Sequence, residues 1–142
     1  ESGRNDFVLQ QAKEIANKRN LKLYWVCPTY KFKRSLGVDK VYNFASIKDF
    51  IYLFANADFI IASSFHGTAF AINFNKEFLS VSPGKYNTRV CSLLKLCKLE
   101  NRYISDRIKT NESLTSIDYN SVNSILNVER RNSISYLTQI CN

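Results

Sequence analysis

One short stretch of the sequence combines side chains that can bind an anion or move a proton. Its residues are Ser63, Ser64, Phe65, His66, Gly67 and Thr68. The only imidazole of the chain, His66, can donate a hydrogen bond or carry a proton near neutral pH. The hydroxyls can donate to phosphate or carboxylate, and a glycine lets a ligand approach the backbone. The alternative is a serine-capped turn in which the histidine satisfies only a backbone group.

A second cluster of polar residues follows about 20 positions later, after Pro83 and Gly84. Lys85 is a point charge, and Arg89 can place two hydrogen bonds on a carboxylate or phosphate. Most charged residues in turns are merely solvated, so this cluster alone is weak evidence. Together with the His66 stretch it predicts three further ligand-binding residues, which are Lys85, Asn87 and Arg89.

Both clusters follow predicted strands and precede predicted helices. The apolar run 59–62 favours a central strand that ends before Ser63, with a helix from near Gly67, and 78–81 favours a second strand followed by a helix over 88–99. In parallel sheets, ligands bind beyond the carboxyl ends of the strands, where helix N-termini attract anions. We therefore expect both clusters on one rim, around one anion.

The remaining segments continue the alternation of helix and strand. We expect a helix over 7–18 capped by Asp6, strands over 21–27 and 41–44, and a helix that begins at a capping box of Ser46 and Asp49. A long helix after Asp118 carries an apolar stripe predicted to be buried: Val122, Ile125, Leu126, Ile134, Leu137 and Ile140. The pattern predicts one α/β domain over 1–142, a Rossmann-like three-layer sandwich with a mostly parallel sheet.

Composition narrows the function. The chain has 142 residues and a formal net charge of +8, which favours anionic partners. Its longest apolar run, 50–55, cannot span a bilayer, and no signal peptide is apparent. Four cysteines without a C-x-x-C pair and a single histidine leave no usual zinc ligand set, so no metal or cofactor is expected, and a reducing, cytoplasmic compartment is favoured. A basic loop with Lys31, Lys33 and Arg34 is weak support for nucleic-acid binding, which we do not expect.

Two blocks carry a resemblance to a known family: ADFIIASSFHGTAFAINFNKEF over 57–78 and NTRVCSLLKLCKLENR over 87–102. In their order of strand, S-F-H-G-T, short helix, strand, N-x-R and leucine-rich helix, they resemble the polysaccharide pyruvyl transferases. The resemblance implies a two-domain fold similar to glycosyltransferases of the B type, with this chain as the C-terminal half of a longer protein. The N-terminal half would then supply the acceptor-sugar surface and part of the donor site, and the isolated domain would be inactive.

The resemblance also implies a reaction. Pyruvate would pass from phosphoenolpyruvate to two hydroxyls of a saccharide as a ketal, in bacterial cell-surface or exopolysaccharide synthesis, in the cytoplasm or at the inner face of the membrane. His66 would contact phosphoenolpyruvate, either as a donor to its phosphate or as the general acid, and the Gly67 and Thr68 amides would hold the phosphate. Some members carry Arg-Leu-His where this chain has Ser64-Phe65-His66. Arg89 or Lys85 is expected to replace that arginine.

Two other classes of function remain open. One is a glycosyltransferase domain that uses a nucleotide-sugar donor, and the other is a non-catalytic module that binds an anion or forms dimers. A nucleotide donor needs an acidic residue for its ribose, and no Asp or Glu lies near His66 or Arg89 in the sequence. That absence favours the smaller anion.

Overall fold

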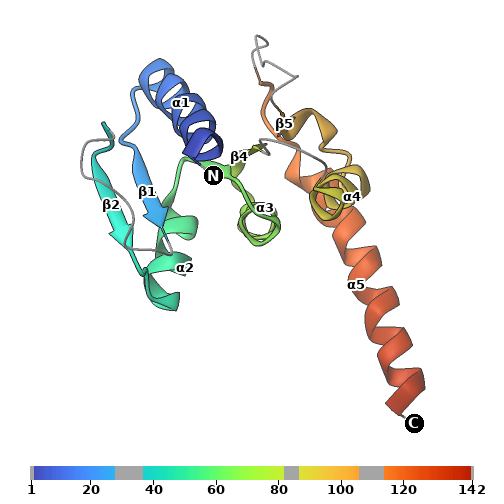
Figure 1. Cartoon of the computed structure of the whole chain (residues 1–142). Helices are drawn as coiled ribbons and strands as arrows, with labels where there is room; N and C mark the ends of the chain where they lie inside the picture. Colours follow the sequence, from blue (N-terminus) through green and yellow to red (C-terminus); the bar gives the residue numbers. More distant parts are fainter. Residues whose placement is uncertain (1, 28–36, 82–86, 106–113, 142) are drawn as a thin grey trace.

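A computed structural model of the chain describes residues 2–27, 37–81, 87–105 and 114–141. It is an α/β structure in which helices and strands alternate (Figure 1). The elements are α1 (Ser2–Arg19), β1 (Tyr24–Cys27), β2 (Lys40–Asn43), α2 (Ile47–Asn56), β3 (Phe59–Ala62), α3 (Phe65–Asn73), β4 (Glu77–Val81), α4 (Thr88–Leu96), a 3₁₀ turn (Glu100–Arg102), β5 (Tyr103–Ile104) and α5 (Tyr119–Cys141).

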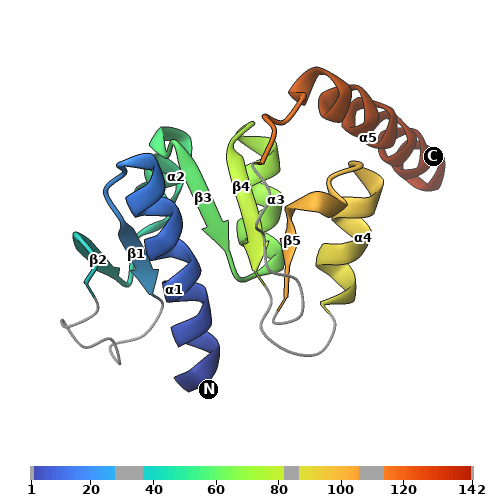
Figure 2. The same ribbon diagram turned by 90° about the horizontal axis from the view of Figure 1, so that it is seen from above.

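All strand pairs in the described residues are parallel, as predicted, but they form two ladders. One joins β1 to β2, and the other has the order β3-β4-β5. Figure 2 shows the two ladders side by side, with α1 running along them. The register pairs Ala62 of β3 with Ser80 of β4, so these two strands end at the same level.

Helices cover both faces of the second ladder, which accounts for the continuous apolar runs in its strands. Ile60, Ala62 and Phe78 face a core that they share with α3, α4 and the start of α5. The alternate positions of the same strands, such as Leu79 and Val81, face α1. Trp25 of β1 also packs against the core that Leu79 and Val81 form with α1. The layers are therefore those of a Rossmann-like sandwich, as the sequence pattern predicts.

Two helix starts test the capping predictions. Ser46 and Asp49 form the predicted capping box of α2: the Ser46 hydroxyl accepts the Asp49 N–H at 3.1 Å, and the Asp49 carboxylate accepts the Ser46 N–H at 3.2 Å. The prediction for Asp6 is wrong, because α1 already begins at Ser2 and Asp6 lies inside it. Helix α2 therefore starts where its capping residue predicts, and helix α1 does not.

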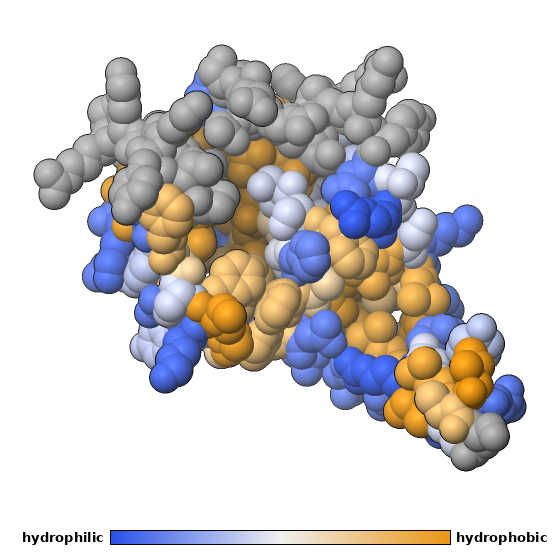
Figure 3. Space-filling model, turned by 60° about the horizontal axis from the view of Figure 1, so that its bottom comes forward, coloured by the Kyte–Doolittle hydropathy of each residue, from blue (hydrophilic) through white to orange (hydrophobic). Residues whose placement is uncertain are grey.

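The predicted apolar stripe of α5 is buried only in its first half. Val122 is buried and Ile125 and Leu126 are half-buried, whereas Ile134, Leu137 and Ile140 are about 60% exposed. The prediction that these three are buried is wrong, because the helix runs past the edge of the body (Figure 1). Apolar side chains gather over α2 and α3 and, separately, at the far end of α5 (Figure 3).

An ion pair between buried Arg102 and half-buried Glu77 anchors the start of α5 to β4. The Arg102 guanidinium is 1% exposed and lies 3.0 Å from the Glu77 carboxylate. Arg102 also donates to the Thr115 carbonyl, and Glu77 accepts the Ile117 N–H at 2.7 Å. The pair thus holds the segment that leads into α5 against the sheet.

Candidate functional site

The structure places the starts of α3 and α4, which carry His66 and Arg89, on the same rim of the sheet. β3 and β4 are adjacent and parallel, so the helices that follow them, α3 and α4, begin at the same edge. α3 and α4 also pack against each other. The helices that carry His66 and Arg89 are therefore neighbours, as the sequence predicts.

The first turn of α3 begins two residues earlier than predicted, at Phe65. Ser64 is its N-cap in an extended conformation, and the Ser64 hydroxyl accepts the Gly67 N–H at 3.1 Å. The Ser64 carbonyl accepts the Thr68 N–H at 3.0 Å. Hence the Gly67 and Thr68 amides, which we expected to hold a phosphate, already have partners inside the protein.

In the first turn of α3, neither the Phe65 nor the His66 N–H has an acceptor among the described residues. They belong to the four N–H groups that an α-helix leaves without an intrahelical partner at its N-terminus. Neither α3 nor α4 has an acidic residue in its first turn. Each helix dipole adds roughly half a positive charge there, so the rim favours an anion.

Gly67 and Thr68 support the turn from inside. Both are buried, and the Thr68 hydroxyl donates to the Ser64 carbonyl at 3.0 Å. A Cβ at Gly67 would lie 3.1 Å from the Ala62 Cβ and 3.2 Å from the Ser64 Oγ. The glycine therefore allows the helix to pack closely on the end of β3, rather than giving a ligand access to the backbone.

His66 is exposed at this rim beside an aromatic ring. Its imidazole lies nearly perpendicular to the Phe65 ring, with the ring centroids 5.8 Å apart. The Arg89 guanidinium carbon lies 5.5 Å from the centroid of the same ring. The half-buried Phe65 ring thus contacts both His66 and Arg89, each of which reaches solvent.

Arg89 lies in the first turn of α4 and is exposed. No carboxylate among the described residues lies within salt-bridge distance of it. Its charge is therefore available to an external anion, and the neighbouring ring restricts where the guanidinium can go.

The remaining predicted residues have different surroundings. Ser63 is exposed at the end of β3. Asn87 is half-buried and caps α4, because its side-chain oxygen accepts the Val90 N–H at 3.4 Å. Lys85 lies outside the described residues, as do Lys31, Lys33 and Arg34. No contact that the structure describes tests a ligand role for Ser63 or Asn87.

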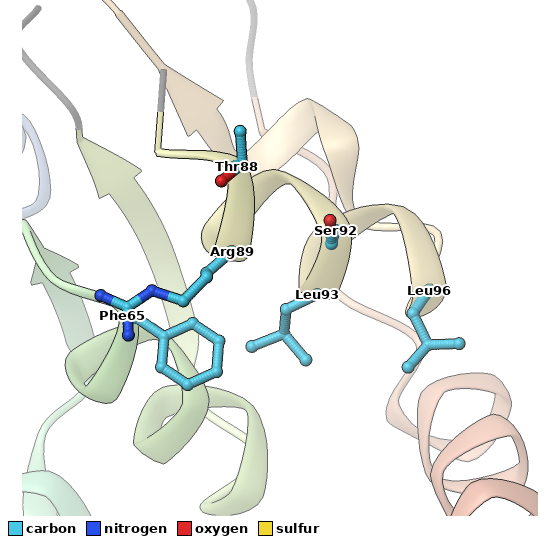
Figure 4. A pocket seen from close by; sticks show the side chains of 6 residues that line it. All are labelled: Phe65, Thr88, Arg89, Ser92, Leu93 and Leu96. Carbon is cyan, nitrogen blue, oxygen red and sulfur yellow. The ribbon is translucent and has the colours of Figure 1, made fainter. Parts of the chain in front are cut away.

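A shallow groove of about 370 Å³ adjoins the rim. It is lined by Phe65, Thr88, Arg89, Ser92, Leu93 and Leu96. In Figure 4 the Arg89 side chain extends from α4 to Phe65, and Leu93 and Leu96 lie further along the same helix. The sequence pattern did not predict Ser92, Leu93 or Leu96 as site residues, although their spacing from Arg89 places them on one face of a helix.

A second feature that the sequence analysis missed is Ser80. It is 2% exposed, and its hydroxyl lies 2.8 Å from that of Thr68. A serine between the apolar neighbours Leu79 and Val81 is the only signal in the sequence.

In the parts of the chain that the structure describes, no three His, Cys, Asp or Glu side chains group as metal ligands, and no helix is long and apolar enough to cross a membrane.

Comparison with known proteins gives one finding. A family model described as polysaccharide pyruvyl transferase matches residues 6–85, more than half of the chain. The match includes β3, α3 and His66, and it ends before Asn87 and Arg89. No curated protein and no solved structure gave a significant match.

Proposed function

The chain belongs to the polysaccharide pyruvyl transferase family, and on that premise we propose that the rim formed by α3 and α4 binds phosphoenolpyruvate. The observation that carries this proposal is the shared contact of His66 and Arg89 with Phe65 at the starts of two helices without first-turn acids. Phosphoenolpyruvate has a phosphate and a carboxylate. Two adjacent anion-favouring helix starts suit a ligand with two anionic groups.

The proposed contacts follow from the hydrogen-bond donors that have no partner in the described part of the chain at the start of each helix. The Phe65 and His66 amides and the exposed imidazole lie together at the α3 start and suit the phosphate. Arg89 suits the other anionic group, because a guanidinium can make two parallel hydrogen bonds to a carboxylate. In this proposal Arg89 takes the part of the arginine that some family members carry at the position of Ser64. Lys85 and Asn87 remain predicted contacts.

The proposed reaction forms a pyruvate ketal on a saccharide. A proton is added to the methylene carbon of phosphoenolpyruvate, and one sugar hydroxyl forms a bond to the resulting cationic C2. A second hydroxyl then bonds to C2 as the bond to phosphate breaks, and both hydroxyl protons leave to solvent or a base. The protein promotes these steps by holding both anionic groups and placing a proton donor.

Two roles for His66 fit this chemistry: donor of a hydrogen bond to the phosphate, or acid that protonates the methylene carbon. Replacement by glutamine separates them, because an amide can donate a hydrogen bond but cannot act as an acid at neutral pH. In the longer protein that carries both domains, if His66 only binds phosphate, we expect His66→Gln to retain more turnover than His66→Ala. If it is the acid, both variants lose activity roughly tenfold or more.

The acceptor is proposed to be a saccharide of a bacterial cell-surface or secreted polysaccharide. We further propose that a facing domain of a longer protein completes its binding surface. The exposed position of His66 and Arg89 leaves the rim accessible from solvent, as a site shared between two domains requires.

The proposed donor is tested by titrating the protein with phosphoenolpyruvate and, separately, with nucleotide-sugars, while the NMR signals of the His66 ring are followed. The chain has one histidine, so the assignment is unambiguous. We expect saturable shifts with phosphoenolpyruvate and none with nucleotide-sugars. Shifts with nucleotide-sugars alone would replace this proposal by a glycosyltransferase. No response to either would call for the same titration of the longer protein, and no response there would contradict a donor site at His66.

A further inference from the structure

A pair of buried hydroxyls joins α3 to β4 beneath the His66 turn. The Oγ1 of Thr68 lies 2.8 Å from the Oγ of Ser80. Thr68 is fully buried and Ser80 is 2% exposed, and the other buried residues of α3 and β4 are apolar or glycine. Neither hydroxyl has a surface through which a ligand could reach it.

The direction of the hydrogen bonds follows from the number of protons. A hydroxyl has one proton to donate, and the Thr68 hydroxyl donates its proton to the Ser64 carbonyl at 3.0 Å. The Ser80 hydroxyl must therefore donate to Thr68. The result is a chain of two hydrogen bonds from β4 to the backbone of the residue that caps α3.

This chain fixes the turn that presents His66. Ser64 accepts from Thr68 through its carbonyl and from Gly67 through its hydroxyl, so its position sets the first turn of α3. Ser80 stands opposite Ala62 in the register, and Phe78 of β4 shares a core with Val90 of α4, the helix that carries Arg89. The two hydroxyls thus couple the α3 half of the rim to the strand that carries the other half.

Stability alone does not call for hydroxyls at these positions. Valine and alanine fill nearly the same space, and replacing both partners of a buried hydrogen bond by apolar groups is often neutral for folding. Removing one partner is costly, because the other hydroxyl stays buried without a bond. The hydroxyl pair of Thr68 and Ser80 is therefore explained better by the position it gives to the first turn of α3 than by a contribution to folding stability.

We propose that Thr68 and Ser80 are positioning residues that hold the His66 turn in register with the Arg89 side of the rim. The effect on a ligand rests on the proposed function, whereas the effect on the turn does not. Thr68 was predicted from sequence to bind the ligand, and here it acts through Ser64 instead.

The test uses variants that separate stability from geometry. Thr68→Val leaves Ser80 without a partner, whereas Thr68→Val combined with Ser80→Ala removes both hydroxyls. Thr68→Ser keeps the hydroxyl. The matched control is Thr138→Val on α5, since the Thr138 hydroxyl donates to the carbonyl four residues earlier at 2.9 Å, the same local bond that Thr68 makes, but far along an exposed helix.

Three quantities are measured for each variant: the free energy of unfolding in urea, the His66 ring signals without ligand, and the dissociation constant of phosphoenolpyruvate. The double variant is expected to regain most of the stability that Thr68→Val loses. Its His66 signals stay shifted from the wild type, and it binds phosphoenolpyruvate about tenfold more weakly or worse. Thr68→Ser and Thr138→Val keep wild-type signals and affinity.

The proposal is overturned if the double variant has wild-type His66 signals and affinity, or if Thr138→Val changes them as much as the double variant does. Should the wild type not bind phosphoenolpyruvate at all, the proposed function fails by itself. The His66 signals of the unliganded variants then decide the positioning role: shifted signals support it, and unmoved signals overturn it.

Discussion

At the scale of single residues, Arg89 combines three properties that an anion site needs. It is exposed, it has no carboxylate partner among the described residues, and an aromatic ring limits its position. A guanidinium stacks on a ring and presents a planar fork, whereas an ammonium does neither as well. The shape of the group therefore matters here as well as its charge.

Substitutions at Arg89 separate shape from charge. We expect Arg89→Ala to weaken phosphoenolpyruvate binding about tenfold or more, and Arg89→Lys to recover only part of it, because lysine keeps the charge but loses the two-pronged contact. Binding is measured by calorimetry at fixed salt. Lys95→Ala, in the last turn of the same helix, is the control and should bind as the wild type does. Full recovery with lysine would contradict the two-pronged contact.

The sequence could predict that these residues lie at one rim of the sheet, but not which of their hydrogen-bonding groups remain unpaired. His66 and Arg89 stand at the ends of strands whose apolar runs are easy to identify. Gly67 and Thr68 are polar or small residues in the same motif, yet their amides are taken up by Ser64. A sequence does not show which amide a capping serine will accept, because that depends on where the helix begins, by one or two residues.

At the scale of elements, two serine caps provide a matched comparison. Ser46 at the start of α2 and Ser64 at the start of α3 each accept an amide at 3.1 Å. Replacing either by alanine should lower the free energy of unfolding by about 1 kcal/mol, measured in urea. Only Ser64→Ala should also weaken phosphoenolpyruvate binding.

The reason is that Ser64 orients the unpaired amides of the next two residues, whereas Ser46 starts a helix without a predicted site residue. Equal loss of binding in both variants would mean that lower stability alone is responsible. Unchanged binding in Ser64→Ala would remove the α3 start from the proposed site.

The link between α5 and the sheet predicts a dependence on pH. Tyr119 donates to the Lys76 carbonyl, and burial, reinforced by the charge of Glu77, raises the pKa of Tyr119 above its usual value of 10.0. In alkali the unfolded chain loses this proton first, so the contribution of Tyr119 to stability is full below pH 10 and falls as pH rises above it.

Urea unfolding at a series of pH values from about 9 to 11 checks this expectation. The free energy of unfolding should decline more steeply above pH 10 in the wild type than in Tyr119→Phe. Burial also raises the pKa of Cys97 above its usual 9.0, so part of the decline should begin at lower pH in both proteins. Identical slopes in the two proteins would contradict a buried, protonated Tyr119.

Elements with strong local signals were predicted well, and those that depend on distant contacts were not. β3 has the predicted bounds, and the capping box of α2 is present. The ion pair of Arg102 and Glu77 joins residues 25 positions apart, and nothing in the local sequence indicates that these two charges meet. The same holds for Thr68 and Ser80, which are 12 positions apart.

At the scale of the whole molecule, α5 has a packed half and an exposed half. We expect Leu137→Ser, on the exposed half, to change the free energy of unfolding by no more than about 0.5 kcal/mol. Val122→Ala removes two buried methyl groups and should cost about 2 kcal/mol. Urea unfolding of both variants compares them, and a large loss for Leu137→Ser would show that the end of the helix is covered in solution.

Periodicity could predict that α5 is amphipathic, and therefore an apolar stripe, but not where the body beneath it ends. Similarly, the alternating pattern predicts parallel strands between helices, while the separation into two ladders depends on how β1 and β3 meet in space. The layer order could be predicted because β3 and β4, the two predicted strands of the second ladder, have buried apolar residues on both faces. The point where the body beneath α5 ends and the division of the sheet into two ladders both depend on packing between distant segments, so a local sequence pattern does not predict them.

The most direct test of the central claim is a double-mutant cycle on phosphoenolpyruvate affinity with His66→Ala, Arg89→Ala and the pair. If both side chains hold one ligand at one rim, each single variant binds more weakly and the two losses are not additive, because the contacts depend on each other. Strictly additive losses, or an unchanged dissociation constant in either single variant, would mean that His66 and Arg89 do not form one site.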